Sequence, residues 1–174
     1  MVGFLVDPAK AVVWRGPMLM GALQQMLGQV NWGELDVLIV DLPPGTGDVQ
    51  LTLSQRAQPT GALIVSTPQD VALLDARKGI DMFKQLNVPI LGMIENMSTH
   101  ICSKCGHEEH VFGHGGVAAE AAKLGVPLLA EIPLDLQIRL ASDGGAPIVV
   151  SQPDSPQAQA FHAVATALIK GALA

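Results

Sequence analysis

The two cysteines of the chain, Cys102 and Cys105, lie three residues apart in the segment ICSKCGHEEHVFGHGG (101–116). The same segment contains His107, His110 and His114, three of the five histidines. Thiolate and imidazole groups together bind zinc in structural sites, and thiolates also bind iron–sulfur clusters. The segment is therefore predicted to bind metal.

Two kinds of metal site fit this spacing. In the first, both cysteines and two of the histidines form a Cys₂His₂ zinc knuckle within one loop. In the second, two copies of the loop meet across a two-fold axis, and their four thiolates hold a [4Fe–4S] cluster. The residue types and their spacing leave both arrangements open.

A second candidate site follows the apolar run LDVLIVDLP (35–43), which is predicted to be a buried strand. A strand that ends in Asp41 and continues into a glycine-rich turn is typical of a Walker B arrangement, in which the carboxylate holds Mg²⁺. Gly45 lacks a Cβ and would let the backbone approach a phosphate group closely. The alternative is that Asp41 only begins a turn. Asp48 is interpreted as the N-cap of the next helix.

The chain does not contain the phosphate-binding sequence G-x-x-x-x-G-K-[ST], because none of its six lysines follows a glycine. We therefore expect these 174 residues not to build a complete triphosphate site. Whether the chain is an enzyme by itself is left open, and we expect it to be inactive alone.

Apolar runs and helical segments alternate along the chain. Short apolar runs bounded by Gly, Pro or Asn predict strands at 35–43, 61–68, 88–96 and 126–133. Longer amphipathic or Ala-rich segments predict helices at 16–30, 68–86, 115–125 and 155–174. This alternation predicts an α/β fold, namely one domain (1–174) with a doubly wound, mainly parallel sheet and helices on both faces. The polar metal loop at 97–114 interrupts the pattern, and ligands are expected at the carboxyl ends of the strands.

Composition excludes several classes of function. The formal charge is −6 and no cluster of Lys and Arg stands out, so we expect no binding to nucleic acid or to a membrane surface. The apolar runs are too short to span a bilayer. Two closely spaced cysteines do not make a disulfide framework, so a reducing, cytoplasmic location is expected.

Eight stretches, in order along nearly the whole chain, resemble the C-terminal part of the Mrp-type iron–sulfur cluster carrier ATPases. This family belongs to the deviant-Walker-A class of P-loop NTPases, together with MinD and ParA, and its Walker A segment lies upstream of the first residue here. The stretches are GFLV (3–6), WRGPM (14–18), DLPPGTGDVQLTL (41–53), STPQDVALLDARKGIDMF (66–83), VPILGMIENMS (88–98), CSKCG (102–106), FGHGG (112–116) and EIPLD (131–135).

The resemblance implies a role for each matching position. Asp41 would be the Walker B acid that holds Mg²⁺, and Gly45 would sense the γ-phosphate of ATP. The amide of Asn96 would read adenine, and Pro133 to Asp135 would line the adenine pocket.

The resemblance also implies that Cys102 and Cys105 bind a [4Fe–4S] cluster shared by the two subunits of a homodimer. The histidines would then be exposed polar residues. The implied function is an ATP-dependent carrier that delivers clusters to apo-proteins. The alternative is a MinD/ParA-like regulatory ATPase with a structural zinc knuckle.

Overall fold

The structure, a computed structural model, describes residues 16–172 and divides the chain into two compact units. The first unit ends at Gln58 and the second begins at Pro59. The resembling stretch 3–6, and residues 14 and 15 of the stretch 14–18, lie outside the described residues.

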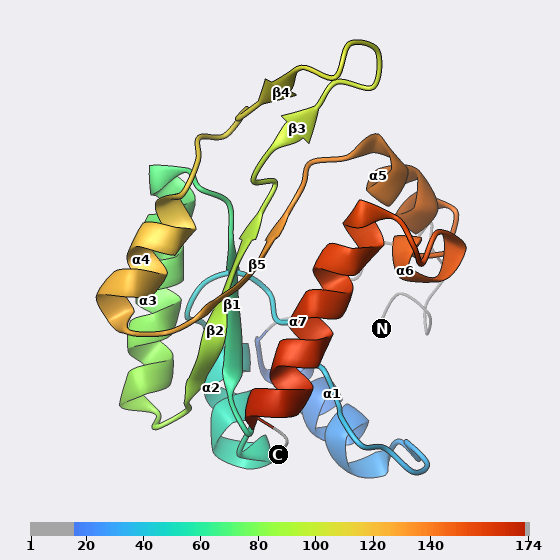
Figure 1. The fold of residues 1–174 in the computed structure, drawn as a ribbon. Coiled ribbons are helices and arrows are strands. Elements are labelled where there is room, and N and C mark those ends of the chain that lie inside the picture. The colour runs from blue at the N-terminus through green and yellow to red at the C-terminus, as the bar shows by residue number, and fades with distance from the viewer. Residues whose placement is uncertain (1–15, 173–174) are drawn as a thin grey trace. The chain divides into compact units, whose positions relative to one another are not determined.

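The second unit is built on a parallel sheet of three strands in the order β1-β2-β5 (Figure 1). The strands are β1 (Ala62–Ser66), β2 (Ile90–Asn96) and β5 (Leu128–Ile132). They confirm the strands predicted at 61–68, 88–96 and 126–133. Their apolar runs are continuous because a central parallel sheet is covered on both faces.

Helices cover both faces of this sheet, as predicted (Figure 1). Helices α3 (Asp70–Gln85) and α4 (Gly116–Leu124) pack on one face, and α7 (Pro156–Ala172) packs on the other. Helix α7 begins as its sequence predicts, because the Ser155 hydroxyl oxygen accepts a hydrogen bond from the Ala158 N–H at 3.1 Å. The α/β prediction is therefore confirmed.

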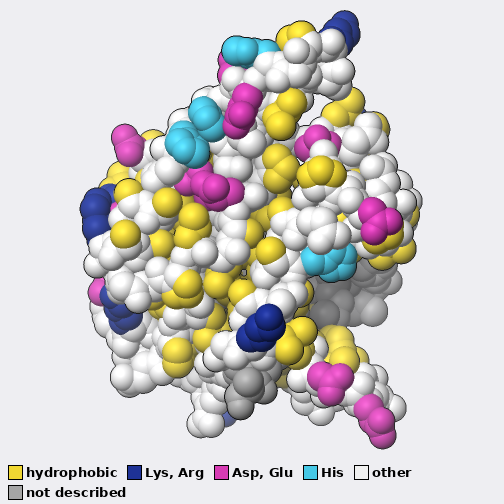
Figure 2. Space-filling model, in the orientation of Figure 1, with side chains coloured by type: hydrophobic (Ala, Val, Ile, Leu, Met, Phe, Trp, Pro, Cys, Tyr) yellow, Lys and Arg dark blue, Asp and Glu magenta, His cyan; other side chains and the backbone are white. Residues whose placement is uncertain are grey.

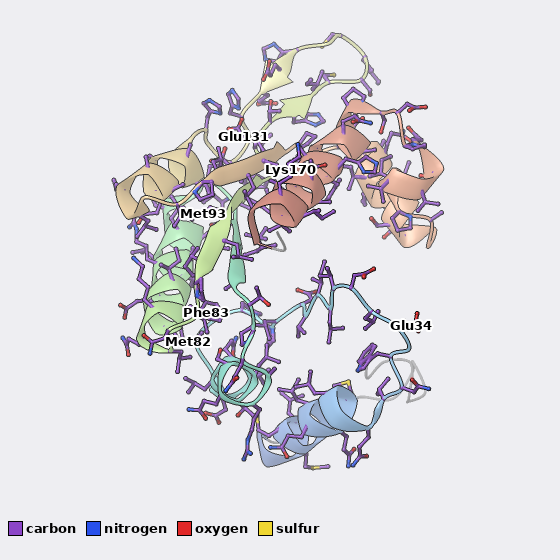
Figure 3. The ribbon with its side chains drawn as sticks, turned by 60° about the horizontal axis from the view of Figure 1, so that its bottom comes forward. Glu34, Met82, Phe83, Met93, Glu131 and Lys170 are labelled. Carbon is purple, nitrogen blue, oxygen red and sulfur yellow. The ribbon has the colours of Figure 1, made fainter. Side chains whose placement is uncertain are left out.

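The core of the second unit lies between these layers. Met93 of β2 is fully buried, and Phe83 of α3 is 8% exposed; both are labelled in Figure 3. Other buried apolar residues are Ile64, Leu73, Ile80, Met82, Val88, Ile94, Val117, Ala121, Ile132, Ile148 and Ala158. Most of them lie on the strands and on the helices that cover the sheet.

Two short helices follow β5 and were not predicted. Helix α5 (Leu136–Asp143) begins after Asp135, whose side chain caps it by accepting from the Gln137 N–H at 2.6 Å. Helix α6 (Ile148–Ser151) is a single turn. Gly144, Gly145 and Pro147 separate these two helices, and both are shorter than the helical segments that the sequence predicted.

The described part of the first unit contains two helices, but the strand predicted between them does not form. Helix α1 (Gly16–Gln29) confirms the helix predicted at 16–30, and α2 (Asp48–Ala57) follows the glycine-rich turn. The predicted strand at 35–43 is absent from this part of the chain, and Ile39 is 77% exposed. The backbone N–H and C=O groups of a buried strand need hydrogen-bond partners on a neighbouring strand. Among the described residues, no strand pairs with the run at 35–43.

None of the helices in the range 16–172 is both long enough and apolar enough to cross a bilayer.

Candidate functional site

The two cysteines lie on a β-hairpin that extends past the carboxyl end of β2 (Figure 1). Strands β3 (His100–Ile101) and β4 (Glu108–Glu109) pair antiparallel, where the sequence predicted only a polar loop. Two hydrogen bonds close the turn between them: the Cys102 N–H donates to the His107 carbonyl at 2.9 Å, and the Gly106 N–H donates to the Cys102 carbonyl at 2.8 Å. The backbone therefore fixes the position of the C-x-x-C sequence.

Both thiols are free and reach the surface. Cys102 is half-buried and Cys105 is exposed. Small apolar cysteines that only fill a core would be buried. The position of this pair instead suits binding to something outside the chain.

The turn stabilises the negative form of the Cys102 sulfur. The pKa of Cys102 is lowered chiefly by the backbone N–H of Lys104, which hydrogen-bonds to the sulfur, and next by the backbone N–H of Cys105. The Cys105 thiol donates a further hydrogen bond that lowers this pKa, and burial opposes the shift. The thiolate is the metal-binding form of cysteine. The turn therefore favours the form of Cys102 that could bind a metal.

This shift predicts a pH dependence for alkylation of Cys102. The rate of reaction with iodoacetamide follows the thiolate fraction, so it should reach half its maximum at a lower pH than for an unstructured cysteine peptide. Lys104→Pro removes the largest cause and should move that midpoint upward, whereas Lys104→Ala keeps the N–H and should not. Mass spectrometry of labelled peptides gives the rates. A midpoint no lower than that of the peptide would contradict this reading of the turn.

The two thiols of the hairpin are not part of a larger group of metal-ligand side chains in the described residues. Among the residues from 16 to 172, neither cysteine belongs to a group of three or more His, Cys, Asp or Glu ligand atoms lying within 4.8 Å of one another. The Nδ1 of His110 lies 3.1 Å from the Ser98 carbonyl oxygen. The ring of His114 packs 4.3 Å from that of His110. In the described chain the cysteines and histidines therefore do not come together as a Cys₂His₂ knuckle.

Three of the candidate nucleotide-binding residues lie at adjacent strand ends of the second unit. Asn96 ends β2 and is the register partner of Ile132 on β5, which directly precedes Pro133. The Asn96 side-chain oxygen accepts from the Met97 N–H at 3.0 Å, which is also the geometry of a simple strand-ending turn. Asp135 accepts from the Gln157 amide of α7 at 2.9 Å in addition to capping α5.

A pocket of about 550 Å³ opens beside these strand ends. Pro133 and Asp135 line it, together with Ile101 of the hairpin and Gln157 of α7, but Asn96 is not among its lining residues. The structure therefore brings Pro133 and Asp135 into one concave site at the carboxyl edge of the sheet, where α/β folds bind ligands.

The other two candidates belong to the first unit. Asp41 is exposed, and Gly45 has a φ of 92°, which favours glycine. A Cβ on Gly45 would meet nothing within 4 Å, so its surroundings are open to a ligand. Asp48 was predicted as the N-cap of α2, but Gly47 takes that position and Asp48 lies in the first turn. If Asp41 is a Walker B acid, it is predicted to lie close to Asn96 and Asp135, and this stays a prediction.

Sequence reasoning missed the residue that holds the glycine-rich turn. The Gln50 side-chain amide donates to the Pro43 carbonyl at 2.6 Å and to the Gly45 carbonyl at 2.9 Å. Gln50 is 3% exposed, so these bonds are shielded from water. The only feature of the sequence that indicated this role is the position of Gln50 near the start of the helix that follows the glycine-rich segment. That feature is common and therefore a weak indication.

The chain is similar to proteins that handle iron–sulfur clusters. The family model of the ParA-type "NUBPL iron-transfer P-loop NTPase" matches residues 1–169. An iron–sulfur cluster carrier protein of Pseudomonas fragi is 50% identical over 170 residues, covering 98% of this chain and 59% of its own length. The iron–sulfur cluster transfer protein NUBPL of Mus musculus is 51% identical over 169 residues, covering 97% of this chain and 53% of its own length. The chain thus spans little more than half the length of these relatives.

Solved structures show the same architecture. A nucleotide-binding protein of Archaeoglobus fulgidus, solved with ADP and containing cobalt, has a TM-score of 0.69 and 40% identity, covering 80% of this chain and 56% of its own. The septum site-determining protein MinD of Pyrococcus horikoshii, solved with Mg-ADP, has a TM-score of 0.60 and 28% identity, covering 89% of this chain and 59% of its own.

Proposed function

Because the chain belongs to the family of NUBPL-type iron-transfer P-loop NTPases, which includes iron–sulfur cluster carrier proteins, we propose that it binds a [4Fe–4S] cluster between two copies of its hairpin and transfers the cluster to apo-proteins. The cluster is cargo, and a nucleotide bound at the strand ends controls its release. The reduced thiols suit a reducing compartment, for which we propose the cytoplasm.

One observation supports this proposal above all: the hairpin presents two surface thiols and no third ligand within the described chain. Cubane clusters take four thiolates, so two hairpins are needed to complete the site. A closed homodimer with a two-fold axis brings identical surfaces together and supplies two further thiolates. The lowered pKa of Cys102 favours the thiolate that such a cluster requires.

A site shared by two chains also suits a carrier, because the cargo must leave. Each hairpin contributes only half of the ligands, so a change in dimer geometry alters the coordination without unfolding either chain. The turn is closed by backbone hydrogen bonds that do not involve sulfur. Loss of the cluster would therefore leave the hairpin intact for another cycle.

We propose a nucleotide site with the following roles. Asp41 holds the Mg²⁺ of ATP, and Gly45 lies against the γ-phosphate, where its open surroundings fit a close approach. Asn96 reads adenine through its amide, and Pro133 and Asp135 line the adenine pocket. Support comes from the ADP and Mg-ADP complexes of the structurally similar proteins.

The alternative function, a MinD/ParA-like regulatory ATPase with a structural zinc knuckle, has less support. It requires two histidines beside the cysteines, whereas within residues 16–172 neither cysteine belongs to a group of three or more ligand atoms lying within 4.8 Å of one another.

A transfer assay tests the proposed function. Protein reconstituted under anaerobic conditions is mixed with the apo-form of an enzyme that needs a [4Fe–4S] cluster, in the presence of an iron chelator. Recovery of enzyme activity is expected to be faster than with equal free iron and sulfide. The double variant Cys102→Ser/Cys105→Ser serves as the matched control and should give no recovery. Equal recovery with the variant would refute the proposal.

A further inference from the structure

A second group of metal-ligand side chains lies at the base of the hairpin, away from the cysteines. Glu95 of β2 and Glu131 of β5 are register partners in the parallel sheet. Partners in register on adjacent strands project from the same face of a sheet, so the two carboxylates are neighbours. His114 lies just before α4, which packs on the β2 and β5 strands. Ligand atoms of all three side chains lie within 4.8 Å of one another.

Glu95 is held in a fixed orientation. Its side chain is fully buried, with one oxygen accepting from the Gly115 N–H at 3.3 Å and the other from the Val117 N–H at 3.0 Å. Each carboxylate oxygen has a second lone pair that can bind a metal ion. Hydrogen bonds of this kind, made by the atoms behind a ligand, orient the ligands of many metal sites.

The negative charges of the two carboxylates lack a basic partner. In the part of the chain that the structure describes, the ion pairs of lysine and arginine go to other acids: Asp75, Glu120 and Asp143. Two carboxylates this close repel each other, and the repulsion is greater because Glu95 is removed from water. A bound cation would relieve it.

His114 determines which class of cation fits. Its ring is exposed and makes no hydrogen bond within residues 16–172, although it packs on His110. Figure 2 shows two histidines beside acidic side chains on this surface, and Figure 3 labels Glu131 at the end of β5. An imidazole nitrogen with two carboxylates suits a first-row divalent transition metal, whereas Mg²⁺ and Ca²⁺ prefer oxygen ligands alone.

We propose that Glu95, His114 and Glu131 bind a divalent transition-metal ion, at a site separate from the cysteine pair. Water completes the coordination on the exposed side. The ion joins the start of α4 to the ends of β2 and β5. Since the segment 97–114 connects β2 to α4, the ion would fix both ends of that segment and so the base of the hairpin.

Cobalt spectroscopy tests this site without interference from the thiols. In the metal-free variant Cys102→Ser/Cys105→Ser, titration with Co²⁺ is expected to produce weak visible d–d bands, without the near-ultraviolet charge-transfer bands of a thiolate ligand. Saturation should occur at one ion per chain. Zinc should displace the cobalt, as expected for the tighter-binding metal.

Two further substitutions in that background identify the ligands. His114→Ala and Glu131→Gln should each weaken Co²⁺ binding about tenfold or more. His107→Ala, which removes another exposed histidine of the same segment, should leave the affinity unchanged. Glu95 is left in place because it caps α4.

Two results would overturn the proposal: failure of the double cysteine variant to bind Co²⁺, or equal affinity in the His114→Ala, Glu131→Gln and His107→Ala variants. Neither result would affect the cluster-carrier proposal, because that proposal concerns the thiols removed in this experiment.

Discussion

Replacing Cys102 or Cys105 by serine is expected to abolish cluster binding while the chain stays folded. Each hairpin supplies two thiolates, so a single substitution leaves two of the four thiolates in a dimer. A serine hydroxyl is a hard, neutral ligand and does not replace a thiolate on iron. The fold should survive, because backbone groups close the turn and neither thiol is buried in the core.

The measurement is iron and visible absorption after anaerobic reconstitution, with circular dichroism and a thermal melt on the same samples. Ser103→Ala is the matched control, because Ser103 lies between the cysteines in the same turn and offers no thiol. That control should keep its iron. If either cysteine variant kept a full cluster, the hairpin could not be the binding site.

Hydrolysis of ATP is expected to be at background for this 174-residue chain and to appear when a segment with the family's Walker A sequence is joined to it. No lysine of the chain follows a glycine, so none is placed to neutralise the phosphates as a P-loop lysine does. In the joined protein, Asp41→Asn should lower kcat about 100-fold, because the Mg²⁺ would lose its carboxylate.

Asp36→Asn is the control for this experiment, since Asp36 is an exposed acid of the same segment. It should leave kcat unchanged. The rate of phosphate release from ATP is measured for the chain alone, for the joined protein and for its two variants. Brisk hydrolysis by the chain alone would contradict the expected need for a Walker A segment, and equal losses from Asp36→Asn and Asp41→Asn would rule out the proposed role of Asp41.

The parts of the fold that could be predicted from the sequence are those fixed by local pattern. Strands β1, β2 and β5 are continuous apolar runs bounded by Gly, Pro or Asn, and a buried parallel strand requires that pattern. The run at 35–43 has the same pattern but forms no strand, because pairing depends on a neighbour that local sequence cannot reveal. The β3–β4 hairpin was missed because strands of two residues show no alternation.

In the candidate sites, too, residues marked by local sequence could be predicted, and residues that act through tertiary contacts could not. Cys102 and Cys105 could be found from residue type and spacing, because few other roles need two thiols three residues apart. Glu95 could not, since its role comes from burial under the start of α4 and from its register with Glu131, which depend on tertiary packing. Gln50 was missed for a similar reason: its contacts run back to a turn whose shape the sequence does not define.

The central claim, that two hairpins share one cluster, is tested most directly by measuring iron per chain together with molecular mass in solution. Anaerobically reconstituted protein should elute as a dimer by light scattering and contain about two iron atoms per chain, because one cubane of four irons serves two chains. The apo-form should show a smaller dimer fraction. A monomer that retains one tightly bound zinc ion and no iron would contradict the shared cluster and favour a site within a single chain.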